Sequence, residues 1–482
     1  MGKLDNLKPQ SVFGYFEDIC SIPHGSGNTK QISDYLVDFA VMHELEHYQD
    51  AANNVIIIKE ATEGYESAAP VIIQGHIDMV CEKDPGKEID FAKEGITPVI
   101  EGDWLRADGT TLGGDDGIAV AMALAALSDD SLQHPRLECV FTVDEEVGMF
   151  GAEAMDVSRL TAKKFLNIDS EEEGIFTVSC AGGVTAKSII PVKRKEKEGN
   201  IYKLVISGLL GGHSGQMIDQ ERGNASILMG RLLYSISKDA KFRLVSLEGG
   251  QKDNAITKDC TAEIRVKDEY CAAIEKTAAD FDKIVRHEFK TSDPGAEVSC
   301  VNEGVKKVSA LDKESTSKVI TLLVNHPQGV QRMSRDIDGL VETSLNLGIL
   351  KLGKKELEAS ASVRSSVASE KKALTDRLTS LTECLGGYME FSGDYPGWEF
   401  RKDSEFRDTC VEVFNRQYGE KPVIQAIHAG LECGLFAGKI DGLDAVSIGP
   451  DMEDVHTSSE RLNIPSVQRT WAFIAEVLKQ SK

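Results

Sequence analysis

Histidine and acidic side chains follow several apolar segments of this 482-residue chain. In APVIIQGHIDMV, His76 and Asp78 come just after an apolar run, and side chains two apart in an extended chain point to the same side. The imidazole could bind a metal ion while the carboxylate orients or polarises the ring. The alternative is an ordinary surface pair, which so short a pattern does not exclude.

Two further segments place carboxylates in a glycine-rich turn and at the end of an apolar run. LRADGTTLGGDDGIAVAMALAAL puts Asp115 and Asp116 where they could cap a helix or bridge two metal ions. LECVFTVDEEVGMFG ends a buried strand in Asp144, Glu145 and Glu146. Such carboxylates are costly unless a cation or a proton balances them. Adjacent side chains point in different directions, so one glutamate could bind metal while the other acts as a general base. The alternative is that these carboxylates form a solvated strand edge.

The last two candidates lie later in the chain. KKFLNIDSEEEG puts Asp169 at a strand end, and AVSIGPDMEDVHTSSERL puts His456 in the loop after another strand. Sites in open α/β sheets form at the carboxyl ends of strands, so we expect the candidates to meet at one sheet edge. Two imidazoles with three carboxylates suit zinc or manganese.

Short apolar strands that alternate with amphipathic helices are expected to position these residues. The expected strands are Val55 to Ile58, Pro70 to Gln74, Leu137 to Val143, Phe165 to Ile168 and Ala445 to Ile448. The expected helices are Ser11 to Cys20, Lys30 to His43, Gly117 to Leu127 and Ser466 to Leu478. The alternation predicts an α/β fold with helices on both faces of a sheet.

The middle of the chain has a different pattern. From residue 184 it is rich in strands, and near residue 387 the first pattern returns. We therefore expect one domain formed by residues 1–183 and 387–482, with a second domain inserted at 184–386. Similar strand–helix segments around Arg265 and Arg364 are compatible with an internal duplication of the inserted domain.

The composition disfavours some classes of function. With 54 basic and 78 acidic side chains, the formal net charge is −24, which argues against nucleic-acid and membrane partners. The start MGKLDNLKPQ lacks a basic segment followed by an apolar run, and no later run is long enough to span a membrane. Ten scattered cysteines without C-x-x-C spacing are typical of reduced thiols. We expect a cytoplasmic protein.

Six motifs resemble those of the zinc-dependent M20 peptidases, specifically the aminoacyl-histidine dipeptidase (Xaa-His dipeptidase, carnosinase-like) branch. They are GHIDMV, LGGDDGIAVA, TVDEEVG, LNIDSEE, GLLGGHSG and GPDMEDVHTSSERL, and the likeness runs nearly end to end. The resemblance implies a zinc-dependent exopeptidase-type α/β/α catalytic domain with a mixed sheet and an inserted α+β lid domain. It also implies hydrolysis of unblocked dipeptides, of the Xaa-His type.

The resemblance assigns metal ligands motif by motif. It implies that His76 and Asp169 hold one zinc ion. Glu146 and His456 would hold a second, with Asp115 bridging the two. The implied cofactors are two Zn²⁺ ions per subunit, for which Mn²⁺ or Co²⁺ could substitute.

Three further residues receive roles in catalysis from the same resemblance. Asp78 would orient His76, and Glu145 would be the general base that deprotonates a water. His213, in the lid motif GLLGGHSG, would stabilise the oxyanion, which implies that the lid closes over the metal ions.

Four residues are implied as substrate contacts. They are Asn254 in DNAITKDC, Arg364 in SVRSSVASEK, and Gly430 and Glu432 in AIHAGLECGLF. Arg364 would grip the terminal carboxylate with its guanidinium group, although a charge on a strand face is the alternative. Gly430 and Glu432 would meet the dipeptide backbone or its free amine. His428, in the same segment, is interpreted as structural.

A rival zinc motif, H-E-x-x-H, is formed by His43, Glu44 and His47. Its context is poor, because the helix expected from Lys30 ends near it and the chain continues as paired strands. Within the enzyme class, an amidase that removes acyl groups from N-acyl amino acids is the second hypothesis. A catalytically silent metal- or peptide-binding module is a third, disfavoured by the presence of Glu145. The lid could also form a homodimer.

Overall fold

The computed structural model describes residues 2–482, which form two compact units. The first contains the chain up to Cys180 together with Phe400–Ala426 and Leu431–Lys482. The second contains Ala181–Glu399 and Ile427–Gly430. No helix among residues 2–482 combines the length and apolar character needed to cross a membrane.

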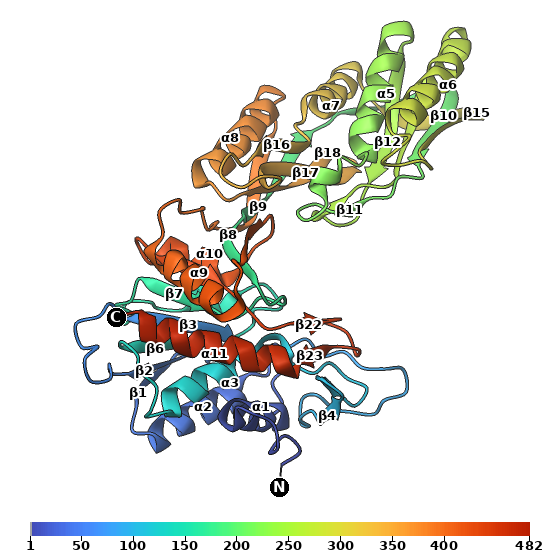
Figure 1. Ribbon diagram of the computed structural model, residues 1–482. Helices are drawn as coiled ribbons and strands as arrows, with labels where there is room; N and C mark the ends of the chain where they lie inside the picture. Colours follow the sequence, from blue (N-terminus) through green and yellow to red (C-terminus); the bar gives the residue numbers. More distant parts are fainter. Residues whose placement is uncertain (1) are drawn as a thin grey trace. The chain divides into compact units, whose positions relative to one another are not determined.

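The first unit is built on an eight-stranded mixed sheet in the order β1-β2-β6-β3-β7-β21-β8-β20 (Figure 1). Its strands are β1 (Glu46–Gln49), β2 (Val55–Lys59), β3 (Val71–His76), β6 (Leu137–Thr142), β7 (Lys164–Asn167), β8 (Ile175–Cys180), β20 (Val423–Ile427) and β21 (Asp444–Ser447). Strand β3 pairs in parallel with β6 and β7, and β21 pairs in parallel with β7. Pairs β1–β2, β2–β6 and β21–β8 are antiparallel. All five strands expected from the sequence are therefore present.

Helices cover both faces of this sheet. They are α1 (Gln10–Ser21), α2 (Lys30–Met42), α3 (Gly114–Ser128), α4 (Phe150–Ala154), α9 (Glu405–Tyr418), α10 (Glu432–Lys439) and α11 (Ile464–Gln480). A Cβ on Gly75 of β3 would lie 2.7 Å from the Cβ of Ala119 in α3. The adjacent Gln74 instead donates to Glu432 of α10 at 2.6 Å. Neighbouring residues of a strand face opposite sides, so α3 and α10 cover opposite faces and the α/β prediction is confirmed.

A small sheet in the same unit brings two distant chain segments together. Its strands are β4 (Pro98–Glu101), β5 (Trp104–Ala107), β22 (Met452–Glu453) and β23 (Arg461–Asn463), in the order β22-β23-β5-β4. Arg461 of β23 pairs with Arg106 of β5 in antiparallel register. The loop between β22 and β23 therefore lies next to the chain that runs from β5 into α3.

The second unit is a nine-stranded sheet with four helices. The strand order is β15-β10-β14-β12-β17-β18-β9-β19, and β16 pairs with β17 off this path. The strands are β9 (Gly182–Pro191), β10 (Arg194–Ser207), β12 (Phe242–Gly249), β14 (Cys260–Val266), β15 (Glu297–Leu311), β16 (Gly329–Met333), β17 (Val341–Leu352), β18 (Glu356–Ser365) and β19 (Tyr388–Tyr395). A separate short pair joins β11 (Gly212–His213) to β13 (Ala255–Ile256).

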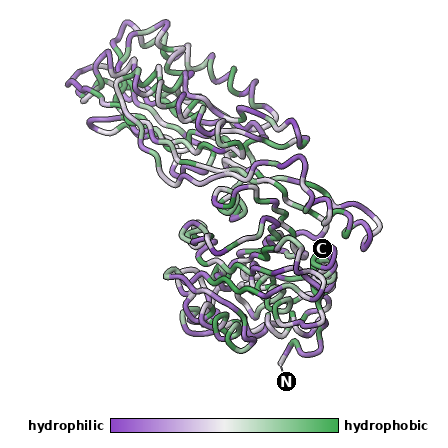
Figure 2. Tube along the Cα trace, turned by 90° about the vertical axis from the view of Figure 1, so that its left-hand side faces the viewer, coloured by the Kyte–Doolittle hydropathy of each residue, from purple (hydrophilic) through white to green (hydrophobic). Residues whose placement is uncertain are grey.

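One face of this sheet carries the helices α5 (Ala225–Asp239), α6 (Cys271–Glu288), α7 (Lys313–Asn325) and α8 (Ala368–Cys384) (Figure 1). Their buried side chains, such as Leu232, Ile274 and Val319, share a core with Leu204 and Ile264 of the strands. Figure 2 shows hydrophobic and hydrophilic residues alternating along these helices, as expected for helices with one buried face. The unit extends past the expected limit at residue 386 because β19 pairs with β9.

Candidate active site

Four parallel strands of the first unit end at the same edge of the sheet. His76 is the last residue of β3, and Asp169 comes two residues after the end of β7. Glu145 and Glu146 follow the end of β6, and the loop containing His456 follows β21. Because β6, β3, β7 and β21 run parallel, these side chains meet at the carboxyl edge of the sheet, where sites in α/β folds form.

The carboxylate of Asp115 lies between the two histidines. Its Oδ1 is 3.1 Å from Nε2 of His76, and its Oδ2 is 3.1 Å from Nε2 of His456. The Nε2 atom of His76 also lies 3.6 Å from Oδ1 of Asp169. The Nε2 atom of His456 lies 2.9 Å from Oε1 of Glu146. The structure thus brings together the five residues that the sequence named as ligands, in two groups that share Asp115.

The tautomer of His76 leaves one nitrogen for this cluster. Its Nδ1 lies 2.9 Å from the backbone carbonyl oxygen of Asp78, which requires a proton on Nδ1. Nε2 therefore points a lone pair at carboxylates unless it too is protonated. Burial alone would lower the pKa of His76, but the carboxylates of Asp115 and Asp169 raise it well above its usual value. A divalent cation between these groups would take the place of that second proton.

The carboxylates show the same need for positive charge. Burial, with neighbouring acidic groups, raises the pKa of Glu145 to about 9 and that of Asp169 to about 6. Hydrogen bonds to Asp115 and Glu146 raise the pKa of the His456 ring to about 10. Closely spaced carboxylate and imidazole donors without basic side chains among them fit a pair of divalent metal ions, with His76 buried and His456 partly exposed to solvent.

Three overlapping sets of side chains have ligand atoms close enough together to hold one metal ion. Within each set the ligand atoms lie within 4.8 Å of one another; the sets are His76 with Asp116 and Asp169, His76 with Glu145 and Glu146, and Asp115 with Glu146 and His456. Glu145 is therefore close enough to the ligands to reach a molecule bound beside them.

Asp78 connects the histidine to the segment of Glu145. Its Oδ1 accepts the backbone N–H of Glu145 at 3.0 Å, and its Oδ2 accepts the hydroxyl of Ser26 at 2.8 Å. The Oδ1 atom lies 3.5 Å from Nδ1 of His76, farther than the Asp78 carbonyl oxygen. The carbonyl thus makes the hydrogen bond to the ring, while the carboxylate holds the strand end that carries Glu145.

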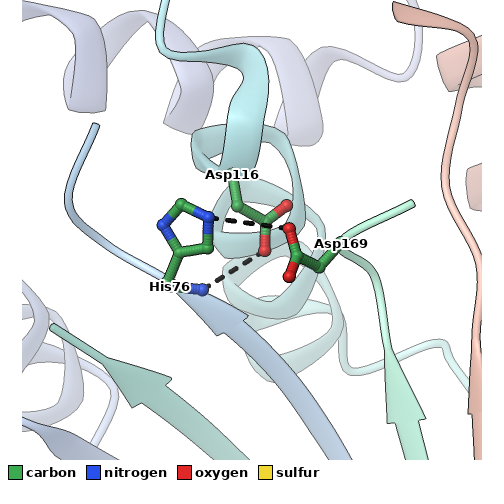
Figure 3. Close-up of side chains that lie close together, drawn as sticks. All are labelled: His76, Asp116 and Asp169. Atoms are coloured by element: carbon green, nitrogen blue, oxygen red, sulfur yellow. Dashed lines mark hydrogen bonds and ion pairs between the residues drawn. The ribbon is translucent and has the colours of Figure 1, made fainter. Parts of the chain in front are cut away.

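Asp116 is a member of the cluster that sequence reasoning noticed but did not select. Figure 3 shows its carboxylate against the backbone N–H of His76, at 3.2 Å, while the ring of His76 faces Asp169. Its Oδ1 is buried and has no hydrogen-bond partner within residues 2–482. Burial raises the pKa of Asp116 well above its usual value. The signal in the sequence was the second aspartate of GGDDG.

A buried polar layer lies beneath the ligands and was also missed. Gln74 and Asn167 precede His76 and Asp169 by two residues, and Nδ2 of Asn167 donates to Oε1 of Gln74 at 2.7 Å. Gln74 and Thr142 both donate to Oε2 of Glu432, at 2.6 and 2.7 Å. Glu432, expected as a substrate contact, is fully buried in this layer, and its Oε1 has no partner among the described residues.

The remaining expected site residues belong to the second unit. His213 lies in β11, and its Nδ1 accepts backbone N–H groups from Gln216 at 3.1 Å and Gly215 at 3.3 Å. This places the proton of the neutral ring on Nε2, and burial lowers the pKa of His213. The Asn254 carbonyl accepts the N–H of Ser214 at 2.9 Å, which places Asn254 next to His213.

Arg364 lies on β18 with only 8% of its surface exposed. One Nη donates to the hydroxyl of Tyr395 at 3.1 Å, whereas the buried Nε has no partner within residues 2–482. No carboxylate in that part of the chain pairs with Arg364. A Cβ built on Gly215 would lie 3.3 Å from its Nε and 3.1 Å from Cε1 of His213, so the two side chains are close.

The segment 427–430 also belongs to the second unit and contains Gly430. His428 is buried there, and its Nε2 lies 2.7 Å from the hydroxyl of Ser344. Burial lowers the pKa of His428 to about 3, so the ring is neutral at physiological pH.

The H-E-x-x-H motif does not form a zinc site. Helix α2 ends at Met42, and His43 is the residue after it. Glu44 has a left-handed φ of 55°, and His47 lies in β1. The two histidines are therefore not one turn apart on a helix, and this rival hypothesis is wrong.

Comparison with known proteins agrees with this geometry. Residues 72–480 match the family described as Peptidase family M20/M25/M40. The chain is 36% identical over 482 residues to the cytosol non-specific dipeptidase of Escherichia coli (strain K12), covering 100% of this chain and 99% of the relative. The crystal structure of aminoacylhistidine dipeptidase from Vibrio alginolyticus matches with a TM-score of 0.94 and 34% identity, over 99% of this chain and 98% of that one. A structure of aminopeptidase PepT from Bacillus cereus shares the fold, with a TM-score of 0.57 and 15% identity. The chain belongs to peptidase family M20/M25/M40.

Proposed function

We propose that this protein is a metal-dependent dipeptidase that hydrolyses the peptide bond of unblocked dipeptides. The observation that carries the proposal is the position of Asp115, whose two oxygens each lie 3.1 Å from a different histidine. A carboxylate so placed can bridge two cations. Two full-length relatives named as dipeptidases support the choice of substrate.

The proposed metal ions are two Zn²⁺, with Mn²⁺ or Co²⁺ as substitutes. His76 and Asp169 would hold one and Glu146 and His456 the other, with Asp115 shared, in line with the two groups of close contacts. When bound, such ions lower the pKa of a water and polarise the peptide carbonyl.

Glu145 is the proposed general base. It would accept a proton from the attacking water and return it to the departing amine. The Asp78 carboxylate supports this role by holding the Glu145 backbone at 3.0 Å. His213 is the proposed donor to the oxyanion, because its Nδ1 accepts N–H groups and leaves an N–H on Nε2.

Arg364 is the proposed partner of the dipeptide carboxylate. It is a buried guanidinium without an acidic partner among residues 2–482, and an anionic substrate would supply one. Asn254 and Gly430 are proposed as further substrate contacts, whereas Glu432, expected as a third, is fully buried beneath the ligands and is not proposed as one. The Vibrio relative is named for aminoacyl-histidine substrates and the Escherichia relative for non-specific activity, so preference for Xaa-His stays a proposal. Cytoplasmic location and a homodimer through the second unit are likewise proposals.

A panel of free dipeptides and N-acetyl amino acids, assayed with zinc and after chelation, tests the proposal. We expect zinc-dependent hydrolysis of the dipeptides, whereas hydrolysis of the acetylated compounds alone would favour the amidase. Metal binding without turnover of either would favour the silent module.

The base is tested by Glu145→Gln in the same assay. This change should leave the zinc content near wild type and lower kcat by roughly 10²–10⁴-fold, the usual contribution of a general base. The exposed Glu172, in the loop after Asp169, offers a control, and Glu172→Gln should keep full activity. A Glu145→Gln enzyme with wild-type kcat would rule out this role.

A further inference from the structure

The carboxylate of Glu460 lies against the loop that carries Asp115. Glu460 is four residues after His456, in the connection between β22 and β23, and only 3% of it is exposed. It accepts four consecutive backbone N–H groups, from Leu112 at 2.7 Å and Gly113 at 3.2 Å on Oε2, and from Gly114 at 2.8 Å and Asp115 at 3.4 Å on Oε1. One side chain therefore fixes the backbone of the whole turn that leads into Asp115.

The turn is shaped to enclose this carboxylate. Gly113 has a left-handed φ of 69°, a conformation that glycine adopts without strain. A Cβ on Gly114 would lie 3.2 Å from Oε1 of Glu460, closer than an ordinary contact. The two glycines of LGGDDG thus allow successive N–H groups to converge on one anion, as in backbone anion-binding nests.

The same carboxylate links two segments that each carry an expected ligand. The N–H of Glu460 donates to the carbonyl of Thr457, which closes a short turn directly after His456. Its side chain holds the backbone of Asp115, while Nε2 of His456 lies 3.1 Å from the side chain of Asp115. The position of Glu460 therefore sets the separation of His456 and Asp115.

Glu460 has no basic partner within residues 2–482; burial raises its pKa, and the four backbone N–H groups are the donors that offset this burial. A carboxylate is required here because both of its oxygens accept. A glutamine would turn an N–H₂ group toward two of the four backbone donors. The site thus requires two accepting oxygens, which packing alone would not demand.

We infer that Glu460 is a positioning residue that holds Asp115 in bridging position between the two proposed metal ions. The inference rests on the proposed function, because it concerns the same metal site. Replacing Glu460 should weaken metal binding even though its side chain is not proposed as a metal ligand. Residues that orient metal ligands have this effect when they are replaced.

Glu138 provides a control with similar burial and backbone contacts. It is a fully buried carboxylate that accepts backbone N–H groups, from Thr161 at 2.9 Å and Ala162 at 3.0 Å, and it differs from Glu460 in also pairing with Arg136 at 3.3 Å. It lies near the start of β6, whereas the site lies beyond the end of that strand. Glu138→Gln should therefore lower the melting temperature of the metal-free protein without changing metal affinity.

The test compares E460Q, E460D and E138Q with the wild-type full chain. Zn²⁺ affinity is measured by competition with a chelator, and the Co²⁺-loaded proteins are compared by their visible absorption spectra. For E460Q we expect an affinity about 10- to 100-fold lower and an altered Co²⁺ spectrum. E460D keeps the charge with a shorter reach and should fall between E460Q and wild type. It also keeps the test decisive if E460Q does not fold.

Two results separate the inference from the function on which it rests. If E460Q and E460D bind Zn²⁺ as wild type does and give its Co²⁺ spectrum, the inference is overturned. An equal loss of affinity in E138Q would overturn it as well, by showing a general effect of stability. A wild-type protein that binds no Zn²⁺ and cleaves no dipeptide would instead refute the proposed function.

Discussion

Removing the guanidinium of Arg364 should affect substrates with a free carboxylate far more than those without one. Only 8% of the residue is exposed, its Nε has no partner among residues 2–482, and Tyr395 supplies its one hydroxyl contact. A dipeptide carboxylate would meet an anion-binding group that is already desolvated. The change Arg364→Met keeps most of the side-chain volume and removes these donors.

The expected size follows from the burial of the pair. Truncating one partner of a buried, hydrogen-bonded charge pair costs about 2–5 kcal/mol. At about 1.4 kcal/mol per factor of ten, kcat/KM for a free dipeptide should fall roughly 30- to 4,000-fold. A dipeptide amide has no carboxylate for Arg364 to bind, so its already low kcat/KM should change by less than about threefold.

In the assay, kcat/KM is measured for the wild type and for Arg364→Met, each with a free dipeptide and with its amide. Arg194→Met is the control. Arg194 donates to the carbonyl oxygens of Val245, Ser309 and Gly353, each at 2.9 Å. These bonds join backbone segments of the second unit, so Arg194 has a structural role. Its replacement should lower stability without discriminating between dipeptide and amide. Equal losses on both substrates for Arg364→Met would refute the proposed carboxylate contact.

Two further predictions concern stability. Burial lowers the pKa of His326 from 6.5 to about 4. Between these pH values the unfolded chain binds a proton at His326 that the folded chain does not. The free energy of unfolding therefore decreases as pH falls through this range. The difference corresponds to about 3 kcal/mol at about 1.4 kcal/mol per pH unit, and urea unfolding of His326→Gln from pH 7 to 4 should show a shallower decline. The exposed His287→Gln should leave the decline unchanged, and the same decline in His326→Gln would contradict the assignment. Separately, a Cβ on Gly75 would lie 2.6 Å from Oδ2 of Asp116, so Gly75→Ala should cost about 1–3 kcal/mol in thermal unfolding, and an unchanged melting temperature would contradict the close approach of β3 to α3.

The sequence predicts the placement of the ligands because each follows an element with a clear pattern. His76 and Asp169 come at the ends of apolar runs, and parallel strands bring such ends to one edge. Asp115 could be found because glycines frame it. Its position between two histidines was implied only by the family resemblance, since no local pattern shows the small sheet that joins β23 to β5.

The buried layer beneath the ligands could not be predicted, for a physical reason. Gln74 lies inside an apolar run, where a single polar residue is compatible with either face of the sheet. Its partner Glu432 is 358 residues away in the chain, and no local pattern reports a contact that only the folded sheet creates. The end of the second unit, expected at residue 386, lies later in the chain because β19 pairs with β9. No change in composition marks this pairing in the sequence.

Metal removal should make the stability of the first unit depend on pH in a defined direction. The folded-state pKa values of Glu145 and His456 are raised to about 9 and about 10, from 4.5 and 6.5. Both groups hold protons more tightly when folded, so their contribution to the stability of the metal-free protein is greatest at low pH and is lost as pH rises through 4.5 to 10. Bound cations neutralise the same carboxylates in place of protons. They also compete with protons for Nε2 of His456. The difference in melting temperature between zinc-loaded and chelated protein should therefore widen from pH 6 to pH 9 in differential scanning calorimetry. A difference that stays constant over this range would show that metal binding does not displace protons from Glu145 and His456, contrary to the prediction.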